Sequence, residues 1–204
     1  MKLQEYATAN QMLVNCDKTK VKLFNSRRKY DFMPRLEIAN ESILEVVEEF
    51  KLLGVILQSD LKWHSNTQYM CQKGYARLWM LRRLKNLGAN ADEMLDVYDK
   101  QIRCVLELAV AVWEPGLTQV EGRQIERLHK SAFSVILGDE YMSYENSLQK
   151  LDRQRLSTRR YNLCRKFAKK SALHPKYQNW LLSTQKSPNL SILGVRSQCL
   201  PTNL

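Results

Sequence analysis

The sequence predicts an α+β fold that is predominantly α, with a small antiparallel sheet near the N-terminus and a basic multi-helix bundle after it. Two patterns predict this division. Short apolar runs with the alternation typical of strands fill residues 19–57. Between residues 64 and 173, apolar residues recur at helical spacing. At 204 residues the chain is long enough for one good core, or for a small subdomain packed on a larger one.

Residues 1–60 are expected to hold one helix and three or four strands. Residues 1–15 have the pattern of an amphipathic helix that begins without a cap, so a preceding part is expected to be missing. The last apolar run contains Gly54 and has no helical period, which indicates a buried strand with a close backbone approach. The strand candidates are Thr19–Phe24, Leu36–Ile38, Ile43–Val47 and Phe50–Leu57.

Residues 61–175 are expected to form the helical part. A helix over 64–87 ends at Gly88, and the pair Asn90 and Glu93 is a plausible cap for the next helix. That helix ends at Pro115 and carries its apolar residues on one stripe: Met94, Tyr98, Ile102, Val105, Leu108 and Val112.

A capping box of Thr118 and Glu121 opens the following helix, which Gly138 closes. A short helix over 144–151 and a long basic helix over 153–173 follow, and Phe167 is expected to point inward on the long one. Residues 176–204 have no period and are expected to be a poorly structured tail. Three tryptophans are expected to be core anchors: Trp63, Trp79 and Trp113.

The surplus of positive over negative charge is confined to residues 150–204. Residues 1–60 carry nine basic and nine acidic residues, and residues 61–149 carry eleven of each. Residues 150–204 carry twelve basic residues and one acid, Asp152, which accounts for the formal net charge of +11. A surplus in one segment is typical of a surface that binds a polyanion such as RNA or DNA. A solvated helix face or a disordered basic tail is the alternative.

Several classes of protein are disfavoured by the composition. No apolar run approaches the length of a membrane span, and the N-terminus has no signal core, so an intracellular protein without a membrane partner is expected. The five cysteines form no CxxC pair and only three histidines are present. This pattern disfavours a zinc site or a disulfide framework, and reduced thiols are expected.

A series of short blocks, in order along most of the chain, resembles the reverse transcriptases of non-LTR (LINE-type) retrotransposons. Each block is weak by itself, whereas ten in the order of the family are specific. The N-terminal blocks are Lys18-Thr19-Lys20-Val21, Phe50-Lys51-Leu52-Leu53-Gly54-Val55 and Asp60-Leu61-Lys62-Trp63. The later blocks are Leu81-Arg82-Arg83-Leu84, Tyr98-x₄-Arg103-x₂-Leu106-Glu107, Val112-Trp113-x-Pro115-Gly116-Leu117-Thr118, Ile125-Glu126-Arg127, Ile136-Leu137-Gly138, Tyr144-Glu145 and Arg159-Arg160-Tyr161-x-Leu163-Cys164-x-x-Phe167-Ala168.

The resemblance implies that residues 1–60 are the end of the palm domain, with the primer grip at the Leu-Leu-Gly run, and that residues 61–175 are the thumb and its extension. The Tyr-x-Asp-Asp turn that holds the catalytic magnesium ions in that family has no counterpart in this sequence. Nucleotidyl transfer needs carboxylates that hold two metal ions. The chain alone is therefore expected to be inactive as a polymerase and to hold no cofactor, with Mg²⁺ expected only in the complete enzyme. Its expected partners are template–primer RNA or DNA and the missing upstream palm and fingers.

The candidate nucleic-acid-binding residues fall into three groups. The resemblance places the first near the triphosphate and the primer end, with two exposed lysines on a strand as the alternative for Lys18 and Lys20: Lys18, Lys20, Lys51 and Gly54. A thumb-like helix supplies the second group, and the alternative for it is a solvated face: Arg77, Arg82 and Arg83. The third group is the basic run of the long helix: Arg159, Arg160, Arg165, Lys166, Lys169 and Lys170. Two aromatic residues that follow this run, Tyr177 and Trp180, are candidates for stacking on unpaired bases.

Three functional hypotheses remain open on the sequence. The first is a truncated reverse transcriptase with at most residual binding to RNA or DNA backbones. The second is a non-catalytic basic helical module that binds nucleic acid, whatever its ancestry, and it predicts binding that weakens steeply with salt. The third is a helical protein-interaction module, which predicts an exposed apolar face and self-association.

Overall fold

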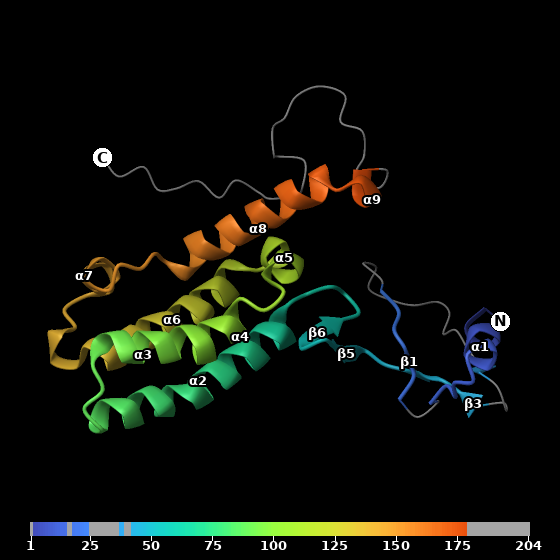
Figure 1. Ribbon diagram of the computed structural model, residues 1–204, viewed down its shortest axis with the longest axis horizontal. Coiled ribbons are helices and arrows are strands. Elements are labelled where there is room, and N and C mark those ends of the chain that lie inside the picture. Colours follow the sequence, from blue (N-terminus) through green and yellow to red (C-terminus); the bar gives the residue numbers. More distant parts are fainter. Residues whose placement is uncertain (1, 16–17, 25–36, 39–41, 179–204) are drawn as a thin grey trace. The chain divides into compact units, whose positions relative to one another are not determined.

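The structure is a computed structural model that describes residues 2–15, 18–24, 37–38 and 42–178. The chain divides into two compact units, Met1–Asn66 (unit 1) and Thr67–Leu204 (unit 2). The described part of unit 1 holds one short helix and small two-stranded sheets, and that of unit 2 is helical (Figure 1). The predominantly helical architecture predicted from the sequence is confirmed. The predicted tail falls mostly outside the described residues, apart from the short α9 (Pro175–Gln178).

The helix of unit 1, α1 (Lys2–Ala9), is shorter than the predicted 1–15. It stops because the backbone turns into the left-handed region at Gln11, with φ of +54°. The amide of Met12 then donates to the carbonyl of Ala7 at 2.8 Å, which closes the last turn in the manner of a left-handed C-cap. The residue that follows, Leu13, is fully exposed.

The prediction of one antiparallel sheet is wrong, because the strands form separate pairs. β1 (Lys20–Val21) pairs in parallel with β4 (Glu45–Val46). β2 (Glu37–Ile38) pairs antiparallel with β3 (Ser42–Ile43). The parallel pair is possible because more than twenty residues separate its two strands, which is enough chain for a return in the same direction. Two-residue strands also offer too few ladder bonds to join into a wider sheet.

The predicted buried strand Phe50–Leu57 is a hairpin of β5 (Glu49–Leu52) and β6 (Val55–Gln58). Leu53 and Gly54 are the two turn residues, with φ of +48° and +91°. Positive φ at both positions is the geometry of a type I′ turn, the turn that fits the twist of a two-residue hairpin. Glycine satisfies it without strain, whereas Leu53 is a bulky residue in a conformation that disfavours it, and its side chain is 91% exposed.

Unit 2 is built around one long central helix, α6 (Gln119–Leu137) (Figure 1). The helices α3 (Ala91–Val97), α7 (Tyr144–Lys150) and α8 (Leu156–Leu173) each contact it. The other elements of the unit are α2 (His64–Asn86), the π-helical segment η1 (Tyr98–Arg103), α4 (Cys104–Leu106), α5 (Val110–Trp113), η2 (Glu114–Gly116) and η3 (Gly138–Glu140).

The helix α2 approaches α6 closely at Gly74, where an added Cβ would lie 2.6 Å from Cδ1 of the buried Leu128. Further along α2, the Lys85 ammonium donates to the carbonyl of Val135 at 2.9 Å in the last turn of α6. A cation at that end is favoured by the helix dipole and satisfies a carbonyl that has no partner within the helix. Gly88, with φ of +82°, ends α2 as predicted.

The two predicted capping boxes are present, at Asn90 with Glu93 on α3 and at Thr118 with Glu121 on α6. The single continuous helix that was predicted to run from the Asn90 cap to Pro115 is not observed. The π-helical segment η1 interrupts it, and Ala109 takes a left-handed conformation with φ of +51°.

The interruption changes which side chains are buried after η1. The observed core residues recur every four positions, since a π-helical segment has more residues per turn than an α-helix: Met94, Tyr98, Ile102, Leu106 and Val110. Leu108 and Val112, which were predicted to be inward, are about half exposed, whereas Trp113 is fully buried, as predicted. No helix among the described residues is both long and apolar enough to cross a membrane.

Candidate nucleic-acid interface

The helix α8, which carries the densest basic run, is held at its N-terminus by an acid of α6. The backbone amides of Leu156 and Ser157 each donate to the carboxylate of Glu126 at 3.1 Å. The first amides of a helix have no partner within it, and the helix dipole favours a negative charge there. Glu126 therefore fixes where α8 begins, and the Tyr144 hydroxyl of α7 donates to the same carboxylate.

Arg160 lies in the interior of unit 2 and is only 2% exposed. Its Nε donates to Glu114 at 2.6 Å, and its Nη1 lies 3.9 Å from Glu126. Burial raises the pKa of Glu114, and the Arg160 charge acts in the opposite direction. A guanidinium in this position does not reach a phosphate at the surface, so the prediction of Arg160 as a binding residue is not supported by its placement.

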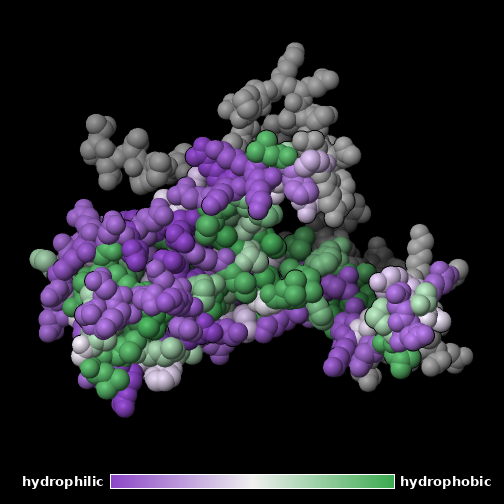
Figure 2. Space-filling view, in the orientation of Figure 1, coloured by the Kyte–Doolittle hydropathy of each residue, from purple (hydrophilic) through white to green (hydrophobic). Residues whose placement is uncertain are grey.

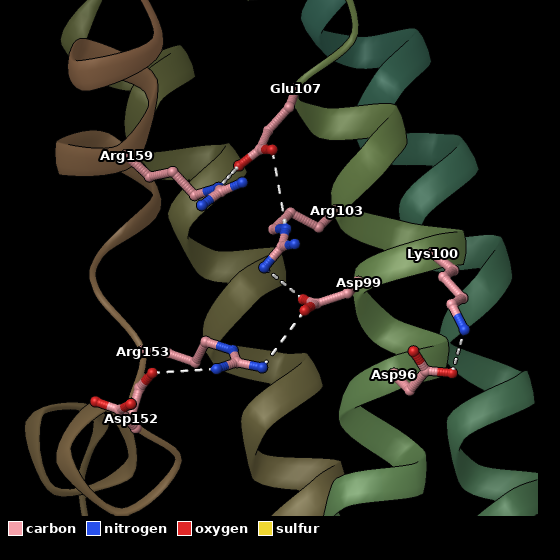
Figure 3. A network of polar contacts seen from close by, with 8 residues as sticks. All are labelled: Asp96, Asp99, Lys100, Arg103, Glu107, Asp152, Arg153 and Arg159. Atoms are coloured by element: carbon pink, nitrogen blue, oxygen red, sulfur yellow. Dashed lines mark hydrogen bonds and ion pairs between the residues drawn. The ribbon is translucent and has the colours of Figure 1, made fainter.

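Three further arginines in the loops around α7 and the first turns of α8 are also paired with acids. Figure 3 shows an alternating ladder in which Arg153 meets Asp99 at 3.4 Å and Arg103 meets Asp99 at 2.6 Å. The same ladder joins Arg159 to Glu107. Arg155 pairs with Glu145 at the surface. The first half of the basic run is therefore neutralised locally by acids of the preceding helices.

The second half of the run is different, because its cations lie beyond these acids. Arg165, Lys166, Lys169 and Lys170 are exposed, and none has an acid partner among the described residues. The i, i+4 spacing places Arg165 beside Lys169, and Lys166 beside Lys170. Figure 2 shows hydrophilic residues over this end of α8, with a hydrophobic patch among them. We call these four residues the α8 cationic face.

Two aromatic side chains of α8 are exposed. Phe167 was predicted to be inward, but it is 59% exposed. Tyr161 is half exposed and lies one turn before Arg165. Tyr177 on α9 is partly exposed and its ring lies 5.0 Å from that of His174. Trp180 falls outside the described residues.

The candidate residues of unit 1 have mixed surroundings. Lys20 forms an ion pair of 2.5 Å with Glu45, its partner in the β1–β4 register. Lys18 is exposed at a turn, where its amide donates to the Asn15 side chain at 3.0 Å. Lys51 is exposed on β5, and Gly54 occupies the hairpin turn.

The candidate residues of α2 also differ in their surroundings. Arg77 donates to the backbone carbonyl of Gln101, which anchors η1 to α2. Arg82 and Arg83 are exposed and have no acid partner among the described residues. The sequence of α2 contains no Asp or Glu at all.

Sequence reasoning missed Trp79, which was predicted to be a core anchor and is 62% exposed. It lies one turn before Arg82 and Arg83 on α2, and one turn after the partly exposed Tyr75. Sequence reasoning also missed a row of exposed cations on α6 without acid partners in the described part of the chain: Arg123, Arg127 and Lys130. Their i, i+4, i+7 spacing was the available signal for one outward face.

A buried aromatic cluster joins η1, α6 and α7. His129 is buried, stacks on Tyr98 with a centroid distance of 5.5 Å, and meets Phe133 edge-on. Its Nδ1 lies 3.2 Å from the Tyr144 hydroxyl. Burial lowers the pKa of His129 to about 3, so the imidazole is neutral in the folded protein at neutral pH.

No three His, Cys, Asp or Glu side chains gather as a metal-binding group within the part of the chain that the structure describes. Comparison with models of protein families, with curated proteins and with solved structures finds no match to this chain.

Proposed function

We propose that this chain binds the backbone of RNA or DNA through the α8 cationic face, without catalysing nucleotidyl transfer. The observation that carries the proposal is the contrast within one basic run. The arginines at 153–160 form ion pairs with acids. Arg165, Lys166, Lys169 and Lys170 are exposed, and none of the four has an acid partner among the described residues. Four adjacent cations on a rigid helix fit the regular charge of a phosphate backbone.

We further propose that the chain corresponds to the end of the palm, the thumb and the following extension of a non-LTR retrotransposon reverse transcriptase. The ordered sequence blocks support this origin, and the helical character of unit 2 agrees with a thumb-like region. Since backbone contacts carry no base information, the proposed binding has little sequence preference.

The test is fluorescence anisotropy of a labelled RNA–DNA hybrid titrated with the purified chain. The variant R165Q/K166Q/K169Q/K170Q is expected to weaken binding by more than about tenfold at low salt, since it removes four phosphate contacts. A matched control removes four exposed cations that are paired with acids: K62Q/K100Q/R155Q/K150Q. Both variants lower the net charge by four, so a general charge effect weakens both equally. Equal affinities of the two variants would contradict the proposal, as would a folded wild-type chain that does not bind.

A further inference from the structure

A second surface of unit 2 combines exposed aromatic rings with unpaired cations on two neighbouring helices. On α2 it comprises Tyr75, Trp79, Arg82 and Arg83, and on α6 it comprises Arg123, Arg127 and Lys130. We call it the α2–α6 face. None of its five cations has an acid partner among the described residues.

The two parts of this face meet where α2 contacts α6. Gly74 of α2 packs directly on Leu128 of α6, and each lies next in sequence to a residue of the face, Tyr75 and Arg127. Burial raises the pKa of the Tyr75 hydroxyl, and the nearby Arg127 charge acts in the opposite direction. Tyr75 of α2 and Arg127 of α6 therefore lie near each other on this face.

The acids of α6 do not neutralise this face. Glu121 is buried in the capping box of its own helix, and Glu126 accepts the amides that open α8. With no acid on α2 either, the α2–α6 face is uniformly positive and favours a polyanionic ligand.

We infer that the α2–α6 face binds single-stranded nucleic acid, with an unpaired base stacked on Trp79 and the flanking phosphates held by the five cations. The choice of a single strand follows from Trp79, which is 62% exposed. The flat face of an indole ring stacks on the face of a base, and base faces are accessible only where the strand is not base-paired. Arg82 and Arg83, one turn further along α2, add positive charge for the phosphates that flank the stacked base. The inference rests on the proposed function only in taking nucleic acid as the ligand, because its residues are all distinct from the α8 cationic face.

The location of the two surfaces makes them separable. The C-terminal half of α8 and that of α2 lie at opposite ends of unit 2 (Figure 1). Trp79 can therefore be changed without touching the α8 cationic face, and its exposure means that its truncation removes little buried area.

The experiment compares two labelled probes, an oligodeoxythymidine of about 15 nucleotides and a blunt hairpin duplex of similar length. W79A is expected to weaken binding of the single strand by roughly 5- to 160-fold, the range for loss of one stacked base, and to leave duplex binding unchanged. W79F keeps an aromatic ring and is expected to retain most of the affinity, whereas W79L keeps apolar area and is expected to behave as W79A. Circular dichroism checks that all variants keep the wild-type helix content.

The outcomes separate this inference from the proposed function. If W79A binds the oligodeoxythymidine as tightly as the wild type, or W79L binds as tightly as W79F, the inference is overturned. Sedimentation that shows two copies joined through Trp79, with no effect of W79A on the single strand, also overturns it. If W79A loses single-strand binding while R165Q/K166Q/K169Q/K170Q changes neither probe, the inference stands and the proposed α8 interface fails.

Discussion

Substituting Arg160 by methionine is expected to destabilise unit 2 severely, although the residue belongs to a basic run. Methionine has a similar length and is a good helix former, so the change mainly removes the charge. It leaves Glu114 in the interior with no cation, since the described structure gives that carboxylate no other ion pair. Breaking a buried pair by removing one partner costs about 3–5 kcal/mol, because the remaining charge is uncompensated.

Urea unfolding followed by circular dichroism measures this loss, with Lys166→Met as the matched control on the same helix. Lys166 is exposed and has no acid partner among the described residues, so its substitution is expected to change the free energy of unfolding by less than about 0.5 kcal/mol. The double variant R160M/E114L removes both charges and is expected to recover most of the stability lost in R160M.

The double variant also keeps the prediction testable if R160M does not fold. A loss below about 1 kcal/mol in R160M would refute the assignment of Arg160 to the interior. A double variant no more stable than R160M would show that the loss comes from packing rather than from the unpaired carboxylate.

Three further predictions test the packing. Gly74→Ala is expected to destabilise the folded chain by about 1–3 kcal/mol, because the added methyl group clashes with Leu128. Gly122→Ala is expected to stabilise it by about 0.5–1 kcal/mol, because its added methyl group meets nothing closer than 3.8 Å. Urea midpoints in the opposite order would contradict the close approach of α2 and α6. Below pH 6.5 the His129 imidazole gains a proton in the unfolded chain but not in the folded one until about pH 3, so the free energy of unfolding is expected to fall by up to about 1.4 kcal/mol per pH unit across that window. His129→Phe is expected to flatten this dependence, and an unchanged pH profile would show that other groups cause it. Leu53→Asn is expected to stabilise the hairpin by about 0.5–1 kcal/mol, because asparagine tolerates positive φ, and a lower melting temperature would count against the type I′ turn.

The features that sequence reasoning predicted are those set by residues close together in the chain. The capping boxes at Asn90 and Thr118 each depend on a partner three residues away, and the stop at Gly88 depends on one residue that accepts a left-handed conformation. Such local rules operate in any context, so they were visible without a structure.

The pairing of the arginines was not visible, because their partners are far away in sequence. Arg160 meets an acid 46 residues earlier, Arg159 one 52 residues earlier and Arg153 one 54 residues earlier. A basic run reads as uniform in sequence, and only the folded chain divides it into a paired half and an unpaired half.

The exposure of Trp79 was missed for a related reason. The apolar stripe of α2 drifts around the helix, so its period alone does not decide on which side Trp79 lies. The structure selects the side of Gly74, since a residue without a side chain lets the backbones approach. That choice buries Leu78 and Leu81 and leaves Trp79 outside.

The central claim is that the α8 cationic face neutralises phosphates, and the salt dependence of binding tests it most directly. The dissociation constant for the RNA–DNA hybrid is measured over a series of salt concentrations, for the wild type and for R165Q/K166Q/K169Q/K170Q. Removal of four phosphate contacts is expected to reduce the slope of log Kd against log salt by about 3.6, since each phosphate of a duplex contributes about 0.9. An unchanged slope, with the control K62Q/K100Q/R155Q/K150Q lowering it instead, would contradict the claim.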